Sequence, residues 1–151
     1  MKKSFDLQKG VDFIGVTCVF FCHDGKGNLL MHKRSHKCRD EQRKWDTGCG
    51  SMEFGETFEQ AVKREIKEEY CVIPKNLKQI GVFNVLRMNK GAKTHWIKVL
   101  FVVLVDPMKV KIGEPEKMEK IQWFPVTGLP KPLHSQLRKD LGRLATLGIK
   151  I

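Results

Sequence analysis

The sequence lacks several features that define whole classes of protein. Its five cysteines form no Cys-x-x-Cys pair, and their odd number argues against a disulfide framework. The longest apolar run, VLFVVLV at 99–105, is far too short to span a bilayer, and no apolar segment follows the two lysines of the N-terminal MKKSFDLQKG. There is no internal repeat and no low-complexity tract. We therefore expect one domain over residues 1–151, cytoplasmic, with no export signal and no membrane anchor.

Positive charge is what the sequence has in excess. Lysine and arginine number 28 against 17 acidic residues, giving a formal net charge of +11, while 41% of the residues are hydrophobic, as in an ordinary folded domain. Such a charge either keeps a protein soluble or attracts phosphate-bearing partners. A nucleotide substrate is the partner we expect. RNA stays open as a second polyanion, and so does the choice between a monomer and a homodimer.

Hydrophobic periodicity predicts strands interleaved with two helices, hence an α/β layered domain. A glycine-rich segment at 45–56 shows no helical periodicity and is predicted to be a loop, as is the charged segment 109–119. The leucines of the second helix recur at helical spacing and predict core packing. Strands are predicted at 11–22, 29–34, 80–88, 95–105 and 120–126, and helices at about 58–70 and 133–147.

The first helix carries an unusual set of acids. On a helical wheel, Glu65 and Glu69 fall inside its apolar stripe and Glu68 lies at the edge of that stripe. Carboxylates crowded against a core repel one another and lose hydration, so a cation is needed to compensate. Arg64 neutralises one acid, and the hard oxygens of the others suit Mg²⁺ or Mn²⁺. Thr57 is the predicted N-cap of this helix.

The segment GSMEFGETFEQAVKREIKEEYCV at 50–72 resembles the Nudix box, the motif of the Nudix hydrolase family. That motif reads Gly, five residues, Glu, seven residues, and then Arg-Glu-apolar-x-Glu-Glu-x-Gly-apolar. A chance match at the six invariant positions has odds on the order of one in ten million per starting position. The residues that match in register are Gly50, Glu56, Arg64, Glu65, Ile66, Glu68, Glu69 and Val72.

The resemblance implies a Nudix-type α/β/α sandwich with a mixed sheet, and it implies roles for individual residues. Mg²⁺, or Mn²⁺ in its place, would be bound by Glu65, Glu68, Glu69 and the Gly50 carbonyl, while Arg64 and Glu56 would hold the helix and the loop. The general base stays open among Glu65, Glu53, Glu116 and Glu119, with a slight preference for Glu65. Arg34, Cys49 and His95 stand where relatives bind substrate.

Two positions depart from the family pattern. Cys71 replaces the glycine that ends the helix in a left-handed conformation, and we expect modified capping there. Cys49 replaces a second glycine beside Gly50. A zinc site at His32, His36 and Cys38 matches no standard spacing, and surface loop positions explain these residues better.

Three hypotheses for function follow. The segment EPEKMEKIQWFPVTGLPKPLH at 114–134 resembles the tail of MutT-like nucleoside triphosphate diphosphatases, which implies conversion of a nucleoside triphosphate, including an oxidised one, to the monophosphate and pyrophosphate. A second hypothesis keeps the chemistry and changes the substrate to ADP-ribose, another nucleotide sugar, a dinucleoside polyphosphate or a 5′-triphosphorylated RNA. A third is a non-catalytic nucleotide or RNA sensor, against which the full set of acids argues.

Overall fold

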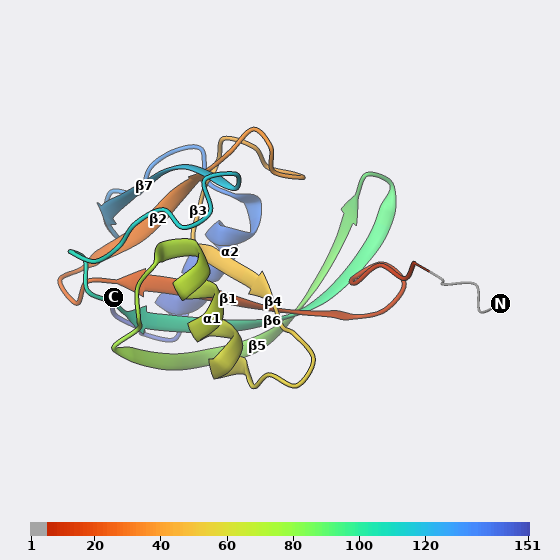
Figure 1. Cartoon of the computed structure of the whole chain (residues 1–151), viewed down its shortest axis with the longest axis horizontal. Helices are drawn as coiled ribbons and strands as arrows, with labels where there is room; N and C mark the ends of the chain where they lie inside the picture. The colour runs from red at the N-terminus through yellow and green to blue at the C-terminus, as the bar shows by residue number, and fades with distance from the viewer. Residues whose placement is uncertain (1–5) are drawn as a thin grey trace.

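The computed structural model describes residues 6–151, which form one mixed β-sheet between two helices (Figure 1). Residues 1–5, part of the stretch on which the absence of an export signal is predicted, lie outside the described residues. The strands are β1 (Gly15–His23), β2 (Asn28–Arg34), β3 (Trp45–Asp46), β4 (Gly48–Ser51), β5 (Asn76–Asn89), β6 (Ala92–Leu104) and β7 (Met118–Pro125), and the helices are α1 (Phe58–Tyr70) and α2 (Ser135–Thr146).

The sheet is mixed because its central pair is parallel. The strand order is β3-β2-β1-β6-β5, with β4 paired to β1 and β7 paired to β2 outside this path. Strands β1 and β6 run parallel, from Gly15 opposite Trp96 to His23 opposite Leu104, and the other pairings are antiparallel. The far part of the β5–β6 hairpin projects from the body, beside the N-terminal segment (Figure 1).

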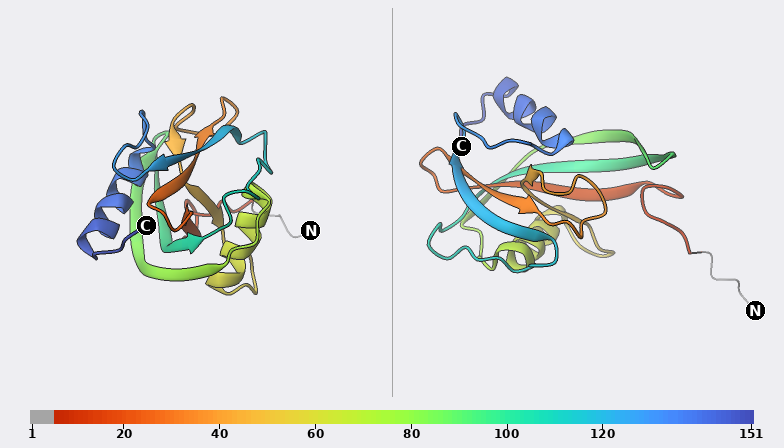
Figure 2. Two further views of the ribbon diagram at one scale, coloured as in Figure 1. Left: turned by 90° about the vertical axis from the view of Figure 1, so that its left-hand side faces the viewer. Right: turned by 90° about the horizontal axis from the view of Figure 1, so that it is seen from above.

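Each helix covers one face of the sheet (Figure 2). Alternate strand residues pack in the two cores on either side of it. On β1, Phe20 packs in the core under α1, and its neighbour Phe21 packs in the core under α2. Leu137 and Leu144 of α2 are buried in the second core, as their spacing predicted. The predicted α/β/α layering is therefore confirmed.

Several predicted bounds differ from the structure. The strand predicted to start at residue 80 begins at Asn76, and the one predicted to start at 95 begins at Ala92. The first strand begins at Gly15 rather than at residue 11. Part of the predicted loop 45–56 is strand, because Gly48 to Ser51 pair with Phe20 to Thr17 of β1. Glycine and serine have low strand propensity, so this pairing is imposed by the neighbouring strand and leaves no trace in the local pattern.

The segment between β6 and β7 closes the C-terminal end of α1. The backbone N–H of Lys111 donates to the Tyr70 carbonyl at 3.0 Å, and that of Gly113 donates to the Glu69 carbonyl at 2.8 Å. Both carbonyls would otherwise lack intrahelical partners. A Cβ on Gly113 would lie 1.9 Å from the Glu68 carbonyl oxygen, so only glycine allows this approach. The loop thus lies directly against the carboxylate end of the helix.

Our expectation of modified capping at Cys71 is wrong. This residue adopts the left-handed conformation itself, with φ 55° and ψ 27°, and its N–H donates to the Lys67 carbonyl at 3.1 Å. Its side chain is exposed, so no packing clash adds to the backbone strain. The contacts made by the 106–117 loop hold the helix end in place despite that strain.

Candidate active site

The start of α1 is fixed by local hydrogen bonds. Thr57 is the N-cap, as predicted, and its hydroxyl accepts from the Gln60 N–H while the Gln60 side chain accepts from the Thr57 N–H. This reciprocal capping box satisfies two of the free donors at the helix start. The helix therefore begins at a defined residue, and the directions of its later side chains are fixed with it.

Arg64 ties the helix to the preceding loop. Its Nε donates to Glu56 Oε1 at 2.6 Å and its second nitrogen donates to Glu56 Oε2 at 3.1 Å, a bidentate pair. The guanidinium also donates to the Ser51 carbonyl at 3.1 Å. The hydrogen bonds from Arg64 lower the pKa of Glu56 to about 2. Arg64 and Glu56 thus make the contacts between helix and loop that their predicted supporting role requires.

The helix turns two carboxylates inward and leaves a third at the surface. Glu65 and Glu69 are 7% and 4% exposed, whereas the side chain of Glu68 is 48% exposed. Arg64 donates to Glu65 at 2.8 Å and to Glu68 at 3.3 Å. A Cβ on Gly50 would lie 1.8 Å from the Glu65 carboxyl carbon, so glycine is required where β4 passes this carboxylate.

Burial raises the pKa values of Glu65 and Glu69 and so disfavours their ionised forms. Desolvation raises the pKa of Glu65, with Arg64 opposing the shift. The pKa of Glu69 is raised well above its usual value, first by burial and then by repulsion from Glu65 and Glu114. Glu69 Oε2 is buried and has no hydrogen-bond partner. The end of the helix thus gathers buried carboxyl groups, one of which has an oxygen that no hydrogen bond satisfies.

Glu114, from the loop that caps α1, joins the two helix acids. Its Oε2 is also buried without a partner, and its Oε1 accepts from Lys117 at 2.9 Å. The proposed loop acids lie elsewhere: Glu116 is 72% exposed and paired with Lys37, and Glu119 is 4.0 Å from His36. Sequence reasoning missed Glu114. The signal that marks it is the adjacent Gly113, which lets the loop touch the helix.

The donor set fits a divalent cation held together with a phosphate-bearing ligand. In the described part of the chain, no three His, Cys, Asp or Glu side chains are placed as a ready-made metal cage. Mg²⁺ rarely uses such cages; it keeps waters and takes one or two carboxylates plus substrate phosphate oxygens. The free oxygens of Glu69 and Glu114, beside Glu65, supply hard ligands for that mode. Thr17 donates to the Gly50 carbonyl at 3.1 Å, which leaves that oxygen a second lone pair.

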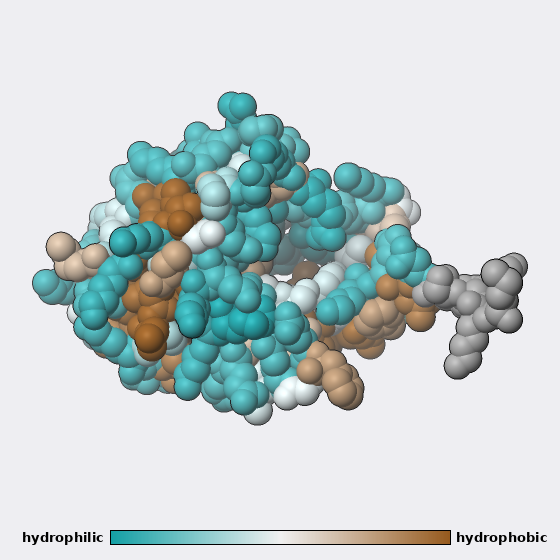
Figure 3. Space-filling view, viewed as in Figure 1, coloured by the Kyte–Doolittle hydropathy of each residue, from teal (hydrophilic) through white to brown (hydrophobic). Residues whose placement is uncertain are grey.

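A cleft of about 560 Å³ opens beside Gly50 and Ser51. Figure 3 shows the surface hollowed between the body of the molecule and the projecting hairpin. This volume lies within the range of small-molecule sites. The cleft walls come from the N-terminal segment at 8–11, the β5–β6 hairpin, the 34–51 segment and the start of α2. A substrate in this cleft would reach the loop that leads into the carboxylate helix.

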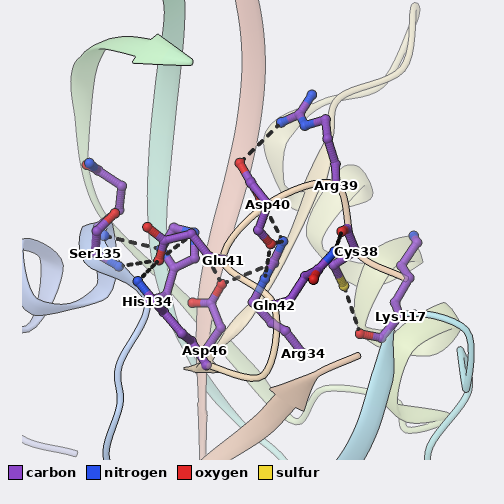
Figure 4. A network of polar contacts seen from close by, with 12 residues as sticks. Arg34, Cys38, Arg39, Asp40, Glu41, Gln42, Asp46, Lys117, His134 and Ser135 are labelled. Atoms are coloured by element: carbon purple, nitrogen blue, oxygen red, sulfur yellow. Dashed lines mark hydrogen bonds and ion pairs between the residues drawn. The ribbon is translucent and has the colours of Figure 1, made fainter. Parts of the chain in front are cut away.

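Two of the three predicted substrate-binding residues line this cleft. Arg34 does so while donating to the Asp40 carboxylate at 2.9 Å, within the network that anchors the 35–44 loop (Figure 4). Cys49 also lines it, and burial, reinforced by Asp46, raises the pKa of its thiol, so the unreactive protonated form dominates. His95 lies 3.0 Å from Asn84 of the neighbouring strand and is not among the lining residues.

His32 is not a surface loop residue. It lies in β2, 5% exposed, and its Nδ1 is 2.7 Å from the Tyr70 hydroxyl. Burial, with Arg34 and His134 as smaller causes, lowers its pKa to about 3, so it stays neutral. His32 is therefore a satisfied core residue that supports the helix end.

The mixed sheet between two helices, with inward carboxylates at the end of the helix that follows a glycine-bearing loop, is the arrangement expected of the Nudix fold. The sequence model of the NUDIX domain matches residues 13–144. The chain belongs to the Nudix family. The solved MutT NUDIX hydrolase from Burkholderia pseudomallei has a TM-score of 0.75 and 26% sequence identity, covering 86% of this chain and 97% of that one.

Characterised relatives differ in the substrates that their names give. The chain is 28% identical over 146 residues to the 8-oxo-dGDP phosphatase NUDT18 of Mus musculus, covering 95% of this chain and 41% of that protein. It is 35% identical over 96 residues to the ADP-ribose pyrophosphatase of Methanocaldococcus jannaschii, covering 62% and 54%. The chain thus spans about two fifths and about half of the length of these relatives. The NUDIX domain of Shewanella oneidensis NrtR, solved with ADP ribose, has a TM-score of 0.69 at 18% identity over 97% and 92% of the two chains, a likeness of fold alone.

Neither helix in residues 6–151 is long and apolar enough to cross a membrane.

Proposed function

We propose that this chain is a divalent-metal-dependent hydrolase that cleaves a phosphoanhydride bond of a nucleoside diphosphate linked to a further group. Our preferred substrate class is a nucleoside triphosphate, including an oxidised one, in keeping with the MutT-like interpretation of the sequence. The observation that carries the proposal is the pair of buried carboxylate oxygens on Glu69 and Glu114 that have no hydrogen-bond partner, in a part of the fold where Glu69, Glu65 and Glu114 repel one another electrostatically, together with a nucleotide-sized cleft lined by Gly50.

The reaction is attack of water on a phosphorus of the anhydride. A new P–O bond forms to the water oxygen, the bond from phosphorus to the bridging oxygen breaks, and one water proton passes to a base. A triphosphate cleaved at its α-phosphorus yields the monophosphate and pyrophosphate. Mg²⁺, when bound, neutralises the transferred charge and lowers the pKa of a coordinated water. Glu65, Glu68, Glu69 and the Gly50 carbonyl are the proposed ligands, and Glu114 joins them as a new candidate.

The remaining residues position this machinery. The Arg64–Glu56 pair holds the β4–α1 loop against the helix, and Gly50 lets the strand backbone approach Glu65. Glu65 is our preferred base because burial raises its pKa and so increases its proton affinity. Glu53 stays a second candidate: its side chain is 64% exposed on the same loop, 3.9 Å from Arg64.

ADP-ribose is the second candidate substrate. It rests on the similarity to the ADP-ribose pyrophosphatase of M. jannaschii. The same attack on a phosphoanhydride would then release AMP and ribose 5-phosphate. The projecting hairpin forms one wall of the cleft, whose volume of about 560 Å³ is in the range of small-molecule sites.

One assay tests the proposal. The protein is incubated with Mg²⁺ and a panel of nucleoside triphosphates and diphosphates, their 8-oxo forms, ADP-ribose and 5′-triphosphorylated RNA, and the products are separated by chromatography. Glu69→Gln is expected to lower kcat by at least about a hundredfold. Glu59→Gln, an exposed acid on the same helix, is the matched control and is expected to behave as wild type. Nucleotide binding without turnover on any substrate would support the non-catalytic sensor instead.

A further inference from the structure

One lysine contacts the carboxylate cluster formed by Glu65, Glu69 and Glu114 and has no part in the hydrolytic reaction. Lys117 Nζ donates to Glu114 Oε1 at 2.9 Å. Burial, the largest influence on this ammonium, lowers its pKa, but the hydrogen bond and the negative charges of the cluster outweigh burial and raise the pKa. Burial likewise raises the pKa of Glu65 and of Glu69, and the positive charge of Lys117 opposes that rise. Lys117 is therefore a counter-ion for the whole cluster.

Arg64, the other cation that acts on these acids, is fixed in place. Its guanidinium donates to both carboxylate oxygens of Glu56 and to the Ser51 carbonyl, and it also pairs with Glu65. In the described part of the chain, the Lys117 ammonium has a single hydrogen-bond partner, and its side chain is 60% exposed. A lysine side chain is flexible, and its ammonium is strongly hydrated. Lys117 can thus leave the cluster for solvent, whereas Arg64 cannot.

The backbone of Lys117 is anchored, so that only its side chain is free to move. Its carbonyl accepts from the Ser35 N–H at 2.9 Å and from the Cys38 thiol at 3.2 Å (Figure 4). Its N–H donates to the Glu114 carbonyl at 3.0 Å. The contact between the Lys117 and Glu114 side chains can therefore open while the turn that carries both residues stays in place.

We propose that Lys117 competes with the divalent cation for the carboxylate cluster and is released to solvent when the cation binds. An ammonium and a divalent cation on the same carboxylates repel each other, and this repulsion is stronger in a part-buried site than in water. The ammonium therefore lowers the affinity of the free protein for Mg²⁺. When no cation is bound, it limits the repulsion among the acids. The inference rests on the proposed function only in taking Glu69 and Glu114 as ligands of a divalent cation.

The sign of one mutational effect tests this role. Isothermal titration calorimetry measures Mg²⁺ binding to the protein without nucleotide. Lys117→Met removes the ammonium and keeps a side chain of similar length, so it is expected to bind Mg²⁺ about five- to tenfold more tightly than wild type. If Lys117 only held the loop in place, the same change would loosen Glu114 and weaken Mg²⁺ binding. Lys117→Arg keeps the charge and is expected to bind Mg²⁺ as wild type does.

Lys37→Met is the matched control. Lys37 is 56% exposed and pairs with Glu116, which lies outside the cluster. Removing its charge is expected to leave the affinity for Mg²⁺ close to that of wild type. Thermal unfolding in EDTA and in saturating Mg²⁺ checks that each variant folds. In EDTA, Lys117→Met is expected to unfold at a lower temperature than wild type, and Mg²⁺ is expected to reduce that difference, since a ligand stabilises most the protein that binds it more tightly.

A second measurement uses the unaltered protein. A brief pulse of acetic anhydride acetylates accessible amines, and mass spectrometry reports the modified fraction at each lysine. Saturating Mg²⁺ is expected to raise the acetylation rate of Lys117 several-fold, because the ammonium loses the carboxylates that raise its pKa. Lys37, whose partner Glu116 does not bind the cation, is the internal control. This labelling of wild type decides the question even where a variant does not fold.

Weaker or unchanged Mg²⁺ binding in folded Lys117→Met would overturn the inference, and so would an acetylation rate of Lys117 that Mg²⁺ leaves unchanged. Binding of Mg²⁺ to neither wild type nor Lys117→Met would overturn it as well. Tighter Mg²⁺ binding by Lys117→Met, when wild type hydrolyses no nucleotide, would leave the inference standing and remove the proposed function. Mg²⁺-dependent turnover with equal Mg²⁺ affinities in wild type and Lys117→Met would do the reverse.

Discussion

Replacing Glu69 by glutamine should change how the stability of the protein depends on pH. The pKa of Glu69 in the folded protein is raised well above the value of 4.5 expected for an exposed glutamate, because the carboxyl is buried and lies near Glu65 and Glu114. Between pH 4.5 and its raised pKa, the folded protein therefore holds a proton on Glu69 that the unfolded chain releases. The stability associated with this neutral form is fully present below pH 4.5 and is lost as pH rises through the folded pKa.

The size of the effect follows from proton linkage. One proton held by the folded state and not by the unfolded state lowers the free energy of unfolding by about 1.4 kcal/mol per pH unit. In EDTA, this contribution to the stability of wild type should thus be lost as pH rises from 4.5 towards the folded pKa of Glu69. Glu69→Gln removes one titrating group, so its slope should be shallower by up to this amount. Other groups titrate in both proteins, and the difference between the two slopes isolates Glu69.

Urea denaturation in EDTA and in Mg²⁺, at several pH values from 5 to 8, measures both quantities. At a hundred times its dissociation constant, Mg²⁺ should stabilise wild type by about 2.7 kcal/mol, and the gain should be much smaller in Glu69→Gln. Glu59→Gln should follow wild type throughout. If Glu69→Gln kept the wild-type slope in EDTA, the burial argument would fail. If the slope of Glu69→Gln were shallower but Mg²⁺ stabilised this variant as much as wild type, Glu69 would not be a metal ligand.

Three further predictions concern the surroundings of the site. Cys71→Gly should raise the free energy of unfolding by about 1 kcal/mol in urea, because glycine adopts φ 55° without strain; Cys71→Ser should give no such gain. Gly113→Ala should force the 106–117 loop away from α1 and displace Glu114, so that Mg²⁺ binding measured by calorimetry becomes weaker. Gly128→Ala should leave Mg²⁺ binding unchanged, because the added Cβ would lie at an ordinary contact distance from its neighbours. Lys98→Met should destabilise the fold by roughly 2–4 kcal/mol, because Asp140 stays buried with only Arg143 as a partner; Lys98→Met combined with Asp140→Leu should recover most of that loss.

Local sequence patterns were sufficient to predict the features that depend on residues close together in the chain. The bounds of α1, its Thr57 cap and the inward direction of Glu65 and Glu69 follow from helical spacing and hydrogen bonds within a few residues. The match of 50–72 to the Nudix box likewise depends on residue types at fixed separations, and it indicated the family that the NUDIX domain match then showed. The metal ligands and the general base named from that resemblance stay predictions.

Other features depend on residues far apart in the sequence. Strand β4 forms because β1 offers it a partner, although its glycines predict a loop. Cys71 keeps a strained left-handed backbone because the loop with Gly113 holds the helix end. A surface position is the prediction for His32, yet its side chain is buried against Tyr70. In each case, contacts made across the fold outweigh the local preference of the chain.

The sequence by itself therefore determined the kind of site: a helix with inward acids that requires a cation. The tertiary structure decided which further residues share that site. It brought Glu114 close enough to Glu69 to raise the pKa of that carboxyl, and it placed Asp46 and Thr47 on the cleft wall. The physical reason is that a helix fixes the directions of side chains within a few turns, whereas the meeting of a loop with a helix is fixed only when the whole sheet has assembled.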